Sequence, residues 1–179
     1  NDGADDVDLL IQSQFNVFPG ATAISDVIKS GAGTLKFANN SGFYRGRTVV
    51  RNGQLLIGKS VLSNVVGPLG QSTNVIQFGD ALSQSTDRPA LIFEGTNFSA
   101  LTCNRAIVVD RLSGVATIGS YSNITLTLSG LMAVSNTMNL LSMATGTNSL
   151  WVAGVISGPG GVTLSGSGTV VLMAQNSYT

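Results

Sequence analysis

The sequence predicts an all-β protein, a right-handed parallel β-solenoid (β-helix), with an antiparallel β-sandwich as the alternative. Short runs of β-branched and aliphatic residues recur along the chain, and most of them are closed by Gly, Asn or Ser. Such runs are typical of strands separated by turns. A sustained helical periodicity is missing, and a Gly-rich segment occurs twice, which favours a solenoid over a sandwich.

The expected strands continue to the end of the chain. In Ile124–Leu128 the aliphatic side chains alternate with Thr125 and Thr127, so one face is apolar and the other polar. The segment that begins at Leu131 is interrupted by polar residues and is interpreted as loop and strand. The runs lie at 48–50, 55–57, 74–78, 90–93, 106–109, 115–118, 124–128 and 169–172.

Internal repetition links the two ends of the chain. Ser30–Phe37 reads S-G-A-G-T-L-K-F, and Ser165–Leu172 reads S-G-S-G-T-V-V-L. An Asn-containing segment that ends in tyrosine follows each copy, at Tyr44 and at Tyr178. A second aligned match a few residues further on makes chance repetition a poor explanation.

These segments resemble the autotransporter-associated β-strand repeat. The resemblance lies in Ile156–Val162, Gly166–Leu172 and Asn176–Thr179, and in Gly46–Gly58 for the second half of the motif. It implies one β-solenoid domain over residues 1–179, with the motif at about 24–58, a truncated copy at about 152–179, and variable spacer coils at 59–151. It also implies an extracellular location at a bacterial cell surface. Arg45, Arg47, Arg51 and Gln54 depart from the usual motif.

The physical basis of such a solenoid is simple. Glycine at the corners allows tight bends, and short strands stack coil upon coil at about 4.8 Å. A coil of about 20 to 25 residues predicts about seven to nine coils and a rod of about 40 Å.

Composition excludes several function classes. The 9 basic and 9 acidic residues cancel, and charged residues make up 10% of the chain, against about 25% in an ordinary domain. There is no histidine, which excludes imidazole catalysis and histidine-ligated metals. No basic stripe suits nucleic acid, and no apolar run is long enough for membrane insertion. No cofactor is expected.

Acidic residues provide two weak candidate sites. Asp80, Asp87, Glu94 and Asp110 could form a carboxylate cluster of the kind that β-helix polysaccharide enzymes use, but scattered surface charge is the favoured interpretation. Asp2, Asp5, Asp6 and Asp8 are loosely spaced like a calcium loop but lack its regular ligands. A frayed terminus is favoured there.

Other conspicuous residues also have a structural interpretation. The single cysteine, Cys103, is expected to be a buried, inert thiol. Arg45 and Arg47 could bind an anionic surface glycan, although a solvated strand face is favoured. The few aromatic residues are expected to lie mostly in the core. Gly158–Gly161 lacks the lysine of a phosphate-binding loop and is interpreted as a corner.

Three functions remain. The first is a non-enzymatic structural module that builds a surface fibre by end-to-end stacking with itself or with neighbouring repeats. The second is the passenger region of an autotransporter-like adhesin, and the third is a carbohydrate-active β-helix enzyme. Because the chain stops within the motif, we expect the last strands to act as an assembly surface. The expected assembly residues are Val170, Val171, Leu172, Tyr178, Thr179, Val49 and Val50.

Overall fold

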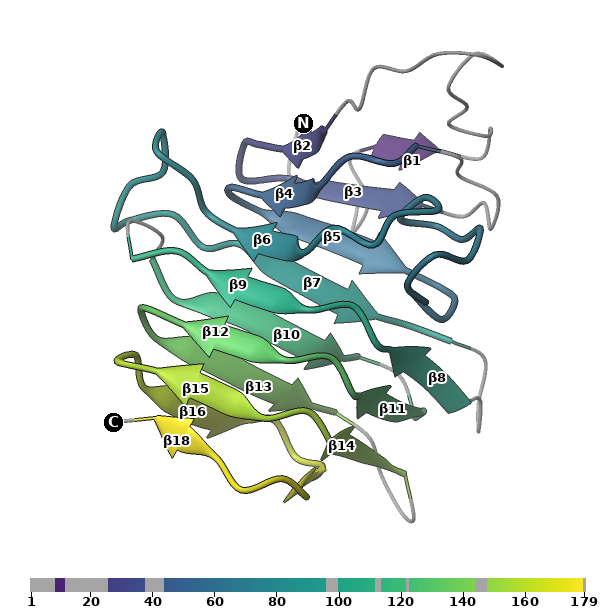
Figure 1. The fold of residues 1–179 in the computed structure, drawn as a ribbon. Helices are drawn as coiled ribbons and strands as arrows, with labels where there is room; N and C mark the ends of the chain where they lie inside the picture. The colour runs from purple at the N-terminus through teal and green to yellow at the C-terminus, as the bar shows by residue number, and fades with distance from the viewer. Residues whose placement is uncertain are drawn as a thin grey trace.

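The structure is a computed structural model that describes residues 9–11, 26–37, 44–95, 100–111, 114–121, 123–143 and 148–178. Figure 1 shows strands stacked in layers from the N-terminal coil to the C-terminal coil. Within these ranges no helix could cross a membrane, because every regular element there is a strand. The all-β prediction is therefore confirmed.

Two seven-stranded sheets form the long sides of the stack. Sheet 1 contains β1 (Leu9–Ile11), β3 (Thr34–Phe37), β5 (Gln54–Ile57), β7 (Ala90–Phe93), β10 (Ala116–Ser120), β13 (Met138–Ser142) and β16 (Val162–Ser165). Sheet 3 contains β2 (Val27–Lys29), β4 (Thr48–Val50), β6 (Ile76–Phe78), β9 (Ile107–Val109), β12 (Met132–Val134), β15 (Ile156–Gly158) and β18 (Ser177–Tyr178).

A shorter third side is present in the C-terminal coils. Sheet 2 has four strands: β8 (Ala100–Cys103), β11 (Thr125–Leu128), β14 (Ser149–Val152) and β17 (Thr169–Leu172). It begins at β8, and an isolated parallel bridge from Val61 to Cys103 precedes it. The described coils therefore become three-sided from β7 onward.

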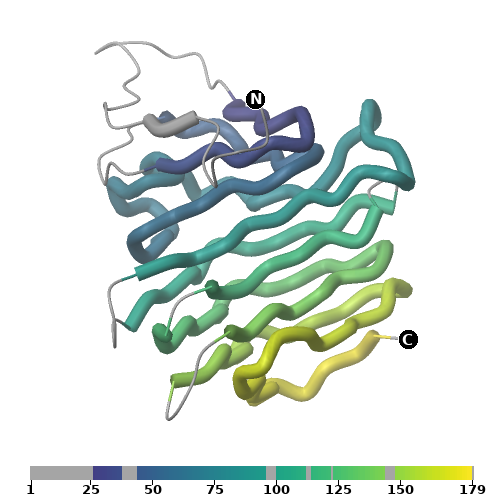
Figure 2. The backbone as a smooth tube through the Cα atoms, turned by 180° about the vertical axis from the view of Figure 1, so that it is seen from behind, coloured from purple at the N-terminus to yellow at the C-terminus, as the bar shows by residue number. Residues whose placement is uncertain are grey.

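Every strand pair in the described residues is parallel, and the chain passes from sheet 1 through sheet 2 to sheet 3 before it returns. The tube in Figure 2 follows these turns from behind. The chain is thus a β-solenoid of about 6 turns, which excludes the antiparallel sandwich.

Coil length varies more than the sequence predicts. Leu35 pairs with Leu55, 20 residues further on, whereas Leu55 pairs with Leu91, 36 residues further on. The long coil carries an excursion between β5 and β6 that adds residues without adding a layer. Because of it, the expected seven to nine coils overestimate the observed number.

The core lies inside the coils and follows the strand alternation. Leu126 and Leu128 are fully buried, while Thr125 and Thr127, which alternate with them, are half-buried on the outer side. Their sheet partners at Leu150 and Val152 continue the same inner ladder. Each such aliphatic side chain contributes about 1.5–3 kcal/mol to folding, so the ladders are the main source of stability.

The two repeat copies occupy different sides of the solenoid. Thr34–Phe37 forms a strand of sheet 1, but Thr169–Leu172 forms a strand of sheet 2. The Gly-x-Gly segment makes a corner in both places, from sheet 3 to sheet 1 and from sheet 1 to sheet 2. The shared motif thus specifies a corner followed by a strand, and it does not specify which side the strand joins.

Candidate functional site

The last coil leaves three strand edges open. Strands β16, β17 and β18 each lie at the edge of their own sheet, so all three sheets end in this coil. Among the described residues no strand pairs with the outer edges of these three. The backbone groups that face away from the stack are therefore available to another strand.

Apolar side chains accompany these open edges. Leu164 of β16 is 59% exposed, Leu172 of β17 is 37% exposed and Met173 after β17 is 58% exposed. Val170 and Val162 are partly buried and pack against the core. The coil thus presents the cross-section of the core together with unpaired backbone.

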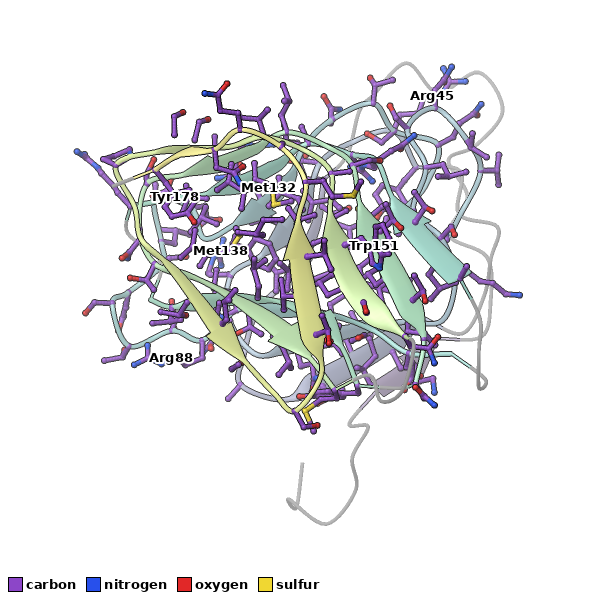
Figure 3. The ribbon with its side chains drawn as sticks, turned by 90° about the horizontal axis from the view of Figure 1, so that it is seen from below. Arg45, Arg88, Met132, Met138, Trp151 and Tyr178 are labelled. Atoms are coloured by element: carbon purple, nitrogen blue, oxygen red, sulfur yellow. The ribbon has the colours of Figure 1, made fainter. Side chains whose placement is uncertain are left out.

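Four of the expected assembly residues lie in this coil. Val170, Val171 and Leu172 are in β17, and Tyr178 is in β18, where it is 36% exposed. Figure 3 views the stack from this end, with Tyr178 labelled on the near coil. Thr179 lies outside the described residues.

Val49 and Val50 are located differently from what the assembly hypothesis requires. They lie in β4, which is paired with β2 on one side and β6 on the other. Both side chains are essentially buried. They belong to the interior of the stack, so direct contact with a second copy is not open to them.

The four acidic residues of the possible enzyme site do not share one corner: Asp80, Asp87 and Asp110 lie in connections from sheet 3 to sheet 1, and Glu94 follows β7 of sheet 1. Asp80 pairs with Arg51 after β6 in sheet 3, whereas Glu94 pairs with Lys36 after β7 in sheet 1. Asp87 accepts a hydrogen bond from the backbone N of Gln84. No group of three potential metal ligands occurs among the described residues, and the calcium candidate Asp2, Asp5, Asp6 and Asp8 lies outside them.

The arginines of the N-terminal motif are engaged in local pairs. Arg47 donates through Nε and Nη2 to Asp26 Oδ2, at 3.0 and 2.6 Å, and Arg51 forks onto both carboxylate oxygens of Asp80. These hydrogen bonds hold the pKa of both carboxyl groups below their usual value. The pairs tie neighbouring coils together on the outer side of sheet 3, whereas Arg45 is exposed.

Cys103 is fully buried at the end of β8, and this burial raises the pKa of its thiol to about 11. Because the thiolate is the reactive form, we expect iodoacetamide at pH 8 to leave the native protein unmodified. After unfolding in guanidinium, one thiol per chain should react, as measured by mass spectrometry. Rapid labelling of the native protein would place Cys103 outside the core.

Arg105 has a structural role that sequence reasoning missed. It is only 1% exposed and is among the largest fully buried side chains of the described structure. Its guanidinium donates to the carbonyl oxygens of Leu69, at 2.7 Å, and Asn74, at 2.7 and 2.9 Å. Burial lowers its pKa, against the opposing effect of the Tyr44 hydroxyl. Arg105 thus fastens the excursion between β5 and β6 to the following coil.

The sequence of the chain is similar to that of a curated protein. The chain is 32% identical over 155 residues to the adhesin BmaC autotransporter of Brucella suis biovar 1 (strain 1330). This chain is similar to part of an autotransporter adhesin. The match covers 84% of the chain but spans only 4% of that protein. No family model and no solved structure matches the chain.

Proposed function

We propose that this chain is a segment of the β-solenoid rod of an adhesin-like protein displayed on a bacterial surface, with a structural and binding role rather than a catalytic one. The observation that carries the proposal is the similarity to an autotransporter adhesin over most of the chain. The ion pairs of Asp80 with Arg51 and of Glu94 with Lys36 support it, because these two carboxylates lie on different corners and an acid–base pair must converge to act on one bond.

The geometry supports a rod because the fold can be extended without rearrangement. A further coil placed on β16, β17 and β18 would pair with three parallel edges and cover Leu164 and Leu172. Nearest-neighbour stacking of this kind is how solenoids grow. A rod of such coils holds a binding surface at a distance from the cell.

Surface display is tested on intact cells of the bacterium that makes the protein. Antibodies raised against residues 1–179 should label intact cells, and protease added outside should remove the signal. An antibody against a cytoplasmic protein serves as the control and should label only permeabilised cells. Labelling of this chain only after permeabilisation would contradict the proposal.

End-to-end stacking is a second candidate function, favoured by the open edges of the last coil. The N of Met173 donates to Val152 O, so its N–H faces β14. Alternate residues of a parallel strand face the same neighbour, so the N–H of Val171 also faces β14, while that of Val170 faces the open edge. A strand that added here would bond to Val170 but not to Val171.

Proline substitution separates assembly from folding at these two positions. Val170→Pro removes an edge donor, so we expect it to abolish concentration-dependent assembly in sedimentation velocity with a small loss of stability. Val171→Pro breaks the ladder to β14 and should lower the melting temperature. If the unmodified chain sediments as a monomer at every concentration, the end-to-end stacking hypothesis is wrong. The proposal that the chain is a segment of a longer rod would then still stand.

A further inference from the structure

The charge of the chain is divided along the solenoid axis. Every Lys, Arg, Asp and Glu lies at or before Arg111. The strands from β10 to β18 therefore contain no ionised side chain at neutral pH. This part of the solenoid offers no ion pair to a ligand, so recognition there must rest on apolar contacts and hydrogen bonds.

The only tryptophan of the chain lies on this uncharged part. Trp151 is the outward residue of β14, between the inward and fully buried Leu150 and Val152. Its side chain is 39% exposed. Figure 3 shows Trp151 among the strands on one side of the coil, away from Arg88. A large aromatic ring left on a strand surface is unusual, because burial would contribute more to stability.

Short side chains surround the indole. Across the sheet, Trp151 pairs with Thr127 on one side and Val171 on the other. Along its own strand the residues two positions away are Ser149 and Ala153. None of these four can reach over the ring, so the ring remains accessible from above.

Hydroxyl groups border the ring on the same surface. We call this surface the sheet 2 outer face; its members, in two parallel ladders, are Ala100, Thr125, Ser149 and Thr169, and Thr102, Thr127, Trp151 and Val171. Within the described part of the chain, neither the indole N–H of Trp151 nor the hydroxyl of Thr127 has a hydrogen-bond partner. Trp151 and Thr127 thus offer free polar groups beside one apolar plate, whereas the Thr125 hydroxyl donates to Asn148 Oδ1 and Ser149 is buried.

We infer that the sheet 2 outer face binds a neutral saccharide, with one sugar ring stacked on Trp151. A pyranose ring presents C–H groups on its face and hydroxyl groups on its rim, which match an aromatic plate bordered by the Thr127 hydroxyl. Anionic glycans are disfavoured because no cation lies on the strands beside Trp151; the exposed Lys59 lines a pocket with Ala100, two strands away. The inference deepens the proposed function, on which it rests for its setting, by giving the rod a class of ligand.

Binding at one open platform should be weak. The face is flat and buries little of a sugar chain, so a dissociation constant of about 1 mM is expected. Because no ion pair forms, the constant should not change between low and high salt. It should also not change across neutral pH, since no residue of the face titrates there.

The experiment titrates the purified 179-residue chain with cellohexaose, maltohexaose and chitohexaose while following tryptophan fluorescence. Because Trp151 is the only tryptophan, a change in its emission reports directly on this face. We expect at least one of the three neutral sugars to shift the emission saturably. If none does, the inference is overturned.

Variants identify the contact by calorimetry or ligand-observed NMR. Trp151→Ala should weaken binding at least about tenfold, and Trp151→Phe should retain part of it. Tyr121→Ala is the matched control, because Tyr121 is also an exposed aromatic of the uncharged part, on the corner after β10. Equal binding by Trp151→Ala and the unmodified chain would overturn the inference.

Two further outcomes would also overturn it. Binding that weakens steeply with salt would indicate an ionic contact elsewhere on the chain. A change in the sedimentation of the free chain on Trp151→Ala, without any sugar effect, would indicate that a second copy covers the face. Loss of sugar binding would leave surface display untouched, because antibody labelling of intact cells tests that separately.

Discussion

Replacing Arg105 by methionine should lower the free energy of unfolding by about 2–6 kcal/mol. Methionine fills much of the space but donates no hydrogen bond, so the carbonyl oxygens of Leu69 and Asn74 lose their partner. Each buried acceptor left without a partner costs about 1–3 kcal/mol. Chemical denaturation followed by circular dichroism measures the change.

Arg88→Met is the matched control. Arg88 also donates to backbone carbonyls, those of Ser85 and Asp87, but it is exposed. Water can replace it there, so its loss should change stability by less than about 0.5 kcal/mol. Hydrogen exchange should accelerate around Leu69 and Asn74 in Arg105→Met alone. Equal effects of the two substitutions would contradict the conclusion that Arg105 holds the excursion between β5 and β6 to the following coil.

The second large effect is expected at a corner of the solenoid, in Gly154→Ala. A Cβ at Gly154 would lie 1.9 Å from the carbonyl oxygen of Gly130 in the preceding coil. This distance is far shorter than any real contact of a Cβ atom. The coils cannot separate at this corner without losing ladder hydrogen bonds on both sides. Overpacking of this kind costs about 3 kcal/mol, so the melting temperature should fall by about 10 °C.

Gly161→Ala provides the control for this steric argument. Gly161 is also at a corner, but a Cβ there would meet nothing within 4 Å. Neither glycine has a positive φ, so the two substitutions differ in the space available rather than in backbone strain. If both variants melt at the same temperature as the unmodified protein, the close approach of the two coils does not require glycine at position 154.

Much of the fold was predictable because strand patterns are local. The alternation in Ile124–Leu128 predicts which side chains turn inward, and the structure confirms it at Leu126 and Leu128. The number of coils was less predictable. It depends on whether residues between β5 and β6 form a layer or an excursion, and their local composition fits either.

The roles of Arg105 and Trp151 were less predictable because their partners are remote in the sequence. The acceptors of Arg105 are backbone carbonyls at Leu69 and Asn74, which no residue type in the sequence marks. The aromatic residues were expected to lie mostly in the core, and nothing in the sequence sets Trp151 apart from them. Its outward position follows from the register of β14 with β11, which is a property of the stack.

The parallel stacking has a mechanical consequence. The ladder hydrogen bonds run along the solenoid axis, so a pull along this axis opens them one coil at a time instead of shearing many at once. Each coil that peels away would release 20 or more residues, or about 70 Å of slack at full extension. Under tension the stack would therefore lengthen in steps and dissipate the load. Arg105 joins two coils through side-chain hydrogen bonds, so we expect the separation of these two coils to need more force than the separation of the others.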